Sequence, residues 1–146
     1  MRIVAFALFL LLAVLSYRGA RWAYIAFVIL GLLWFPVRSG FHFGPPPCEW
    51  TFDLPMAVYS LTNYAHVLLF INFFLMTQRQ LRDVKGALLW SALACLVMGF
   101  LIELDEGATG TGHCRMRDLV PDSAGALIGA AIFSGWRWWR LRRNGI

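Results

Sequence analysis

The sequence predicts an all-α fold, a multi-pass transmembrane helix bundle of about five helices that forms one membrane domain over residues 1–146. The chain is 60% hydrophobic and 14% charged, with a mean hydropathy of +0.64, whereas about a quarter of the residues of a soluble domain are charged. Its apolar runs are separated by short charged clusters, as in polytopic membrane proteins. Nucleic acid is not an expected partner, because the basic residues flank these runs and form no stripe on a polar domain.

The first two runs, Ile3–Tyr17 and Trp22–Phe35, predict a tight helical hairpin. Both are shorter than the roughly 20 residues that cross the hydrocarbon core, so each must borrow flanking residues. Arg18 and Arg21 lie between the runs and can reach the membrane interface along their apolar stems. A cleaved signal peptide over residues 1–16 is the alternative, but no A-x-A cleavage site follows it. We predict a retained helix, and a bundle of four helices if that first helix does not cross.

The third run, Leu54–Thr77, contains polar and aromatic residues at helical spacings: Tyr59, Asn63, His66 and Phe70. One continuous helix would place all four on one face. His66 would lie about 18 Å along its axis at about 1.5 Å per residue, near the middle of the membrane. There its imidazole either contacts a proton or ligand, or forms an interhelical hydrogen bond near Asn63, which is the interpretation we favour.

The fourth and fifth runs are Gly86–Leu104 and Ser123–Trp136. The fifth contains GALIGAA, in which Gly125 and Gly129 lie four residues apart. Small residues at this spacing let another backbone approach closely, so we predict tight helix packing at both glycines. The neighbouring helix belongs to the same chain or, alternatively, to a partner membrane subunit.

The distribution of Lys and Arg predicts the orientation of the bundle. With five crossings, four basic residues lie on one side and nine on the other, namely Arg18, Arg21, Arg79, Arg82, Lys85, Arg137, Arg140, Arg142 and Arg143. This excess places the basic tail, residues 137–146, in the cytoplasm and the loop over residues 103–122 on the outer side. The tryptophans agree, because all seven lie near the ends of runs, where an aromatic belt is expected.

The cysteines give a sharper prediction from this orientation. Cys48 and Cys114 both fall in outer loops, whereas Cys95 lies within the fourth run. An oxidising outer compartment allows facing thiols to pair. We therefore predict a Cys48–Cys114 disulfide, which contributes at most about 4 kcal/mol by the chain-entropy estimate. The alternative is two unrelated thiols.

The segment ELDEGATGTGHCRMRDLVPD, from Glu103 to Asp122, holds five acids, two arginines, a histidine and a cysteine. Arg115 and Arg117 lie close to the expected start of the last helix, which Asp122 or Ser123 is positioned to cap. A helix N-terminus carries a positive partial charge. Together these groups predict an anion site for a phosphate or a carboxylate.

The acids of the segment permit a second chemistry. Glu103 and Glu106 are one helical turn apart, and with His113 and Asp118 they could hold a metal or share a proton. Their spacing matches no known metal motif, and the chain contains no catalytic or cofactor motif that we recognise. We therefore predict no metal, cofactor or catalytic residue. Arg–acid pairs that close the outer ends of the last two helices are the simplest structural interpretation.

Several of these residues are spaced as in a known set of motifs. His66 matches the histidine of a D-K-x-x-H-F-like helix start, and Glu103 matches the glutamate of E-x-x-Q at a helix end. Asp118, Gly125 and Gly129 match the spacing of D-x-x-x-N-x-x-G-x-x-x-G. These motifs belong to the VanZ-like membrane proteins, which the chain resembles over about residues 55–135.

The resemblance has departures, namely Thr62-Asn63 for Asp-Lys, Glu106 for Gln, Asp122 for Asn, and a loop arginine that matches either Arg115 or Arg117. It implies a bacterial cytoplasmic (inner) membrane location and a single site made of the His/Glu pair and the polar loop. It implies no catalytic role, because no activity is established across the family, whose name comes from a member associated with low-level teicoplanin resistance.

We therefore expect a small envelope protein, with membrane lipids as partners, that binds a lipid-linked or anionic ligand at an outer-face cluster. The cluster comprises His66, Glu103, Glu106, His113, Arg115, Arg117, Asp118 and Asp122. The alternative is an accessory or structural subunit of a larger membrane complex.

Overall fold

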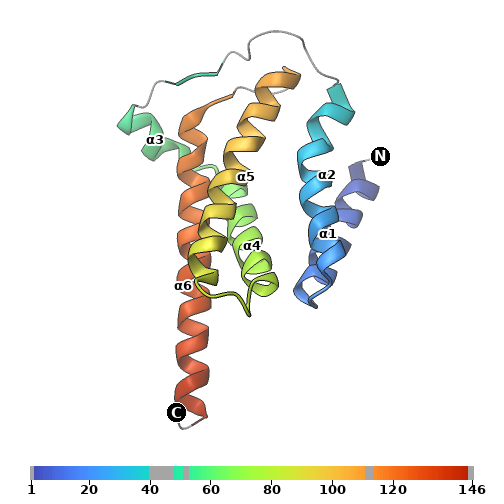
Figure 1. Ribbon diagram of the computed structural model, residues 1–146. Coiled ribbons are helices and arrows are strands. Elements are labelled where there is room, and N and C mark those ends of the chain that lie inside the picture. The colour runs from blue at the N-terminus through green and yellow to red at the C-terminus, as the bar shows by residue number, and fades with distance from the viewer. Residues whose placement is uncertain (1, 40–47, 51–52, 111–113, 145–146) are drawn as a thin grey trace.

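The computed structural model describes residues 2–39, 48–50, 53–110 and 114–144, and within them the predicted all-α bundle is confirmed. Figure 1 shows the helices. In chain order they are α1 (Arg2–Tyr17), α2 (Arg21–Ser39), α3 (Leu54–Ser60), α4 (Tyr64–Gln80), α5 (Ala87–Thr109), the 3-10 turn η1 (Met116–Asp118) and α6 (Leu119–Arg143).

Within the described residues, two segments are long and apolar enough to cross a membrane: α5, and Met116–Arg143, which comprises η1 and α6. The α3–α4 pair makes a third if it is counted as one span, although it is bent by 70°. The helices α1 and α2 are apolar but shorter, and they pack against each other as a hairpin. These features indicate a small multi-pass membrane protein.

The long helices run alternately up and down, so that their connections gather at two ends of the bundle (Figure 1). We refer to the end with the Cys48–Cys114 bond as the disulfide end, and to the opposite end as the basic end. At the basic end α6 extends beyond the other helices (Figure 1). Three arginines of this extension lie over indole rings: Arg140 over Trp136, Arg142 over Trp138, and Arg143 over Trp139.

The third apolar run is not the continuous helix that its periodicity predicts. The helix α3 ends at Ser60, and α4 begins at Tyr64 after a turn. In that turn the Thr62 hydroxyl donates a hydrogen bond to the Tyr59 carbonyl oxygen at 2.8 Å. Local side-chain bonds of this kind compete with the helical backbone ladder, and they accompany the break here.

The bend overturns one expectation about this run. Tyr59 is exposed on α3 and does not share the face of His66 and Phe70, which lie on α4. His66 lies in the first turn of α4. Asp122, which lies 2.9 Å from it, packs against Gly99, near the middle of α5. The expected depth of His66 near the middle of the membrane therefore stays a prediction.

The two glycines of GALIGAA lie where α6 packs against α4. A Cβ atom on Gly125 would lie 2.5 Å from the Val67 carbonyl oxygen, and one on Gly129 would lie 3.0 Å from the Phe74 Cβ. The absence of side chains thus allows the two helices to pack this closely. The glycine stripe faces a helix of the same chain, beside the core that contains Phe70 and Phe74.

We expect Gly125→Ala to lower the free energy of unfolding by about 1–3 kcal/mol, as over-packing of a dense interior does. The atom that the new methyl group would meet is a backbone oxygen, which has little freedom to shift. Gly135→Ala on the same helix is the control, because nothing lies within 4 Å of the added Cβ. Thermal unfolding in detergent measures both variants, and equal melting temperatures would contradict the close approach.

Candidate functional site

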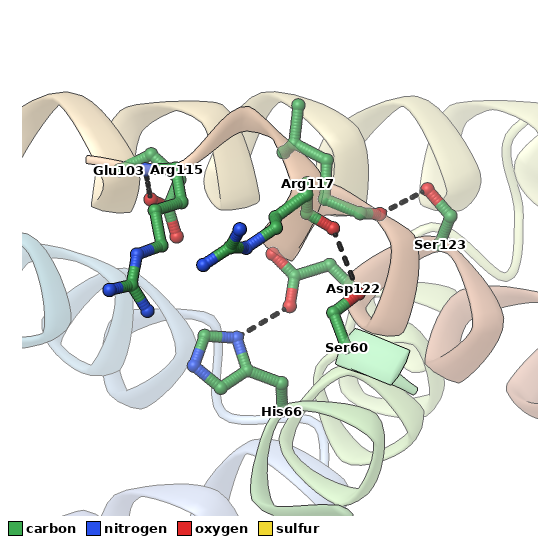
Figure 2. Close-up of polar contacts among 8 residues, drawn as sticks. Ser60, His66, Glu103, Arg115, Arg117, Asp122 and Ser123 are labelled. Carbon is green, nitrogen blue, oxygen red and sulfur yellow. Dashed lines mark hydrogen bonds and ion pairs between the residues drawn. The ribbon is translucent and has the colours of Figure 1, made fainter. Parts of the chain in front are cut away.

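The centre of the candidate site is a polar pair between α4 and α6. His66 Nδ1 lies 2.9 Å from Asp122 Oδ1 (Figure 2). The Asp122 side chain is 2% exposed, whereas that of His66 is 24% exposed. A buried carboxylate is costly unless it is hydrogen-bonded, so His66 supplies the partner that Asp122 requires. The interhelical hydrogen bond that we favoured for His66 is thus confirmed, and its partner is Asp122.

Neither Asp122 nor Ser123 caps the last helix, contrary to the prediction. The helix α6 begins at Leu119, and Asp118 stands at its N-cap without a side-chain capping bond. Ser123 Oγ donates to the Leu119 carbonyl oxygen at 2.7 Å, within the helix. Pro121 is tolerated because the backbone N–H groups of a first helical turn have no intrahelical partner.

A third helix leaves room for the carboxylate of Asp122. A Cβ atom on Gly99 of α5 would lie 2.6 Å from Asp122 Oδ2 and 3.2 Å from Leu119 Cδ2. Gly99 therefore allows α5 to approach the start of α6. Gly99 is not among the predicted site residues, although it stands one helical turn before Glu103 and so lies on the same helix face.

Glu103 binds the backbone of the loop that follows α5. Its side chain is buried, with 1% exposed, and its Oε2 accepts a hydrogen bond from the Arg115 backbone N–H at 2.7 Å (Figure 2). On the other side of the loop, Ser60 Oγ donates to the Arg117 carbonyl oxygen at 3.1 Å. The two bonds fix the segment before α6 to α5 and to α3.

The predicted Cys48–Cys114 disulfide is present in the structure. Beside the disulfide, the backbone N–H and the backbone carbonyl group of Glu49 both form hydrogen bonds with the segment that contains Cys114. Its N–H donates to the Cys114 carbonyl oxygen at 2.8 Å, and its own carbonyl oxygen accepts from the Met116 N–H at 3.2 Å. A short extended pairing therefore holds the segment after α2 to the segment before α6.

The two loop arginines share one carboxylate. Arg117 Nη1 lies 3.6 Å from Glu49 Oε1, and Arg115 Nε lies 3.9 Å from Glu49 Oε2. Glu49 is not among the predicted cluster residues, although its position beside Cys48 places it near Cys114 once the disulfide is predicted. This pairing partly neutralises the two arginines that were expected to bind an anion.

An apolar cavity of about 880 Å³ lies between the α1–α2 hairpin and the helices α4 and α5. Its walls are mainly aromatic and aliphatic, and include Phe9, Phe27, Trp34, Phe70, Phe73 and Met98. Among the described residues that line it, three have amide or ionisable side chains: His66, Asn72 and Glu106. The cavity thus combines a long apolar wall with a few polar groups, as ligand sites commonly do.

The His66–Asp122 pair presents one imidazole nitrogen away from the carboxylate. Nδ1 contacts Asp122, and the second ring nitrogen points away from it (Figure 2). His66 also lines the cavity. A carboxylate partner fixes the orientation of an imidazole, whose other nitrogen can then accept or donate one hydrogen bond.

The hairpin is hydrogen-bonded to α4 towards the basic end. In the described part of the chain, two tyrosines of the hairpin bond to α4: the Tyr17 hydroxyl donates to Asn72 Oδ1 (3.1 Å) and to the Asn72 carbonyl oxygen (3.2 Å), and the Tyr24 hydroxyl bonds to Thr77 Oγ1 (2.9 Å). Two side chains of α4 bond back to the hairpin. Arg79 Nε donates to the Tyr17 carbonyl oxygen (3.3 Å), and Gln80 Nε2 donates to the Ser16 carbonyl oxygen (2.8 Å) and to Ser16 Oγ (3.2 Å). All of them involve the second half of α4, whereas His66 lies in its first turn. Toward the disulfide end, the hairpin is held to α4 by packing alone within these residues.

The structure brings seven of the eight predicted cluster residues to the disulfide end, in different roles. His66 and Asp122 form a pair, Glu103 holds the loop backbone, and Glu106 lines the cavity. His113 lies outside the described residues. Among the residues that are described, no group of three or more His, Cys, Asp or Glu side chains has the arrangement of a metal site.

Comparisons with protein-family models, with curated proteins and with solved structures give no match to this chain. The resemblance to the VanZ-like proteins therefore stays a prediction from motif spacing.

We expect the denatured protein, prepared without reductant, to react with a thiol reagent at one of its three cysteines. The reactive residue is Cys95, which is the free cysteine of the described structure, because Cys48 and Cys114 are bonded. Reduction before labelling should raise the count to three, as measured by intact-protein mass spectrometry. Identical counts with and without reductant would contradict the disulfide, and Cys95→Ser, with an expected count of zero before reduction, is the control.

Proposed function

We propose that the protein binds a lipid-linked ligand, whose hydrocarbon chain occupies the apolar cavity and whose head lies beside His66 and Glu106. The observation that carries this proposal is the cavity itself. Its volume of about 880 Å³ lies within the roughly 300–1,000 Å³ that is typical of ligand sites. The polar residues on an otherwise apolar wall match the two parts of an amphipathic molecule.

The attachment of the hairpin supports entry from the membrane. Hydrogen bonds hold α1 and α2 to the second half of α4, while the first half of α4 carries His66. The hydrophobic effect does not drive helices together within a membrane, so interhelical hydrogen bonds add to the packing that holds them. The hairpin is therefore held more firmly towards its hydrogen-bonded, basic end. A chain can therefore enter sideways between the hairpin and the core.

A lipid-linked ligand fits this geometry better than a soluble anion. Arg115 and Arg117, the cations expected to bind an anion, both pair with Glu49. Neither lines the cavity. The charged groups at the polar end of the cavity are Glu106 and the His66–Asp122 pair. Neither provides a guanidinium group that could bind a free anion through two hydrogen bonds.

The proposed orientation puts the disulfide end outside the cell and the basic end in the cytoplasm. It follows from the excess of Lys and Arg at the basic end, and an oxidising outer compartment is where the disulfide would form. The ligand would then lie in the outer leaflet of the bacterial inner membrane. The accessory-subunit alternative stays a prediction, and a partner would need a face other than the glycine stripe, which α4 covers.

We expect Ala13→Phe to reduce the lipid that stays bound to the purified protein by at least about tenfold, which corresponds to 1.4 kcal/mol. Ala13 lines the cavity, so the phenyl ring would occupy the space of the chain. Ala7→Phe is the matched control, because Ala7 is exposed on the same helix and lines no part of the cavity. Native mass spectrometry in mild detergent measures the bound lipid.

A second blocking variant, Gly31→Leu, approaches the same cavity from α2. The new side chain would meet the flexible end of Met98, which can move, so the fold should tolerate it. Melting temperatures identify any variant that does not fold. Equal lipid retention in Ala13→Phe, Gly31→Leu and Ala7→Phe would rule out the cavity as the binding site.

We expect a C-terminal fusion to green fluorescent protein to fluoresce in a bacterial host, and a C-terminal fusion to alkaline phosphatase to be inactive. Both results follow if the arginines after Trp136 hold the end of α6 in the cytoplasm. The reverse pattern would place the basic end outside and would contradict the proposed orientation.

A further inference from the structure

We infer that the head of the bound lipid carries a primary ammonium group, which Glu106 binds in the cavity. The inference rests on the proposed function and names the class of its ligand. It starts from the charges on the cavity wall, where His66 and Glu106 are the ionisable residues among those that the structure describes.

These two residues give the polar end of the cavity a negative charge. His66 is hydrogen-bonded to the Asp122 carboxylate, so a protonated imidazole there is already neutralised, and a neutral one leaves the Asp122 charge in place. Glu106 is half-buried on the wall, and within the described residues no ion pair involves its carboxylate. A cation is the complementary partner.

The neighbouring groups increase this preference. Asp105, next to Glu106, has a carboxylate oxygen that is buried and lacks a hydrogen-bond partner within the described part of the chain. The nearby arginines pair with Glu49 and do not line the cavity. An anionic head beside Glu106 would therefore meet a like charge, which is unfavourable, while the nearby Arg115 charge is already paired with Glu49.

Hydrogen bonding favours a primary ammonium over a quaternary one. A primary ammonium has three N–H donors, and the wall offers acceptors in the Glu106 carboxylate and, when His66 is neutral, its second ring nitrogen. Charge-assisted hydrogen bonds are about twice as strong as neutral ones. A trimethylated ammonium keeps the charge but has no donor.

The test compares phospholipids that share acyl chains and phosphate and differ in the head, with ethanolamine, choline or glycerol. The full chain in mild detergent is titrated with each, and binding is measured by native mass spectrometry. We expect the protein to bind the ethanolamine lipid about tenfold more tightly than the glycerol lipid, with the choline lipid in between. Glu106→Gln should remove this preference and still bind all three through the cavity.

Asp83→Asn is the control for the change of acid to amide, because Asp83 is exposed at the basic end beside Arg82. It should keep the preference for ethanolamine. Equal or tighter binding of the glycerol lipid by the unaltered protein overturns the inference. So does a preference that survives in Glu106→Gln, or a complete loss of binding in that variant when it is folded.

The outcomes separate the inference from the function on which it rests. If Ala13→Phe removes the binding of all three lipids but the unaltered protein has no headgroup preference, the cavity stands and the ammonium assignment fails. If Ala13→Phe leaves the binding of all three unchanged, the proposed function itself fails. The headgroup preference of the unaltered protein decides the ligand class even if Glu106→Gln does not fold.

Discussion

The structure depends on the close approach of α4 and α6. Gly125 and Gly129 present no side chains to Val67 and Phe74, so the two helices can pack more closely than side chains at these positions would allow. This approach brings the first turns of both helices together, and His66 reaches Asp122. The buried carboxylate is then hydrogen-bonded rather than isolated, which avoids a cost of several kcal/mol. Packing and polar chemistry in this bundle are thus consequences of one interface.

The bundle consists of a closely connected half and a hairpin whose hydrogen bonds to that half gather towards the basic end within the described residues. On one side, α4, α5 and α6 meet around the Asp122 carboxylate, and the disulfide, Glu103 and Ser60 fix the loop above them. On the other side, the α1–α2 hairpin is hydrogen-bonded only towards the basic end within the described chain, and the cavity lies beneath it. The polar pair beside this apolar wall is the arrangement on which we base the proposal of an amphipathic ligand.

Much of the fold could be predicted from composition and spacing, because hydropathy identifies membrane helices and a charge count assigns loops to sides. That assignment placed Cys48 and Cys114 together, and GALIGAA indicated a tight helix contact. The break after Ser60 could not be predicted, because the apolar periodicity continues through it while a local Thr62 bond accompanies the turn. The His66–Asp122 pair and the cavity required knowledge of which helices are neighbours, and no spacing within one helix contains that information.

An experimental structure of the protein in nanodiscs of native lipid would test the central claim most directly. The account predicts chain-shaped density between the hairpin and the helices α4 and α5, with its polar end beside Glu106 and with His66 still bonded to Asp122. A hairpin packed onto α4 and α5 along its whole length, with side chains filling the space between them, would contradict it.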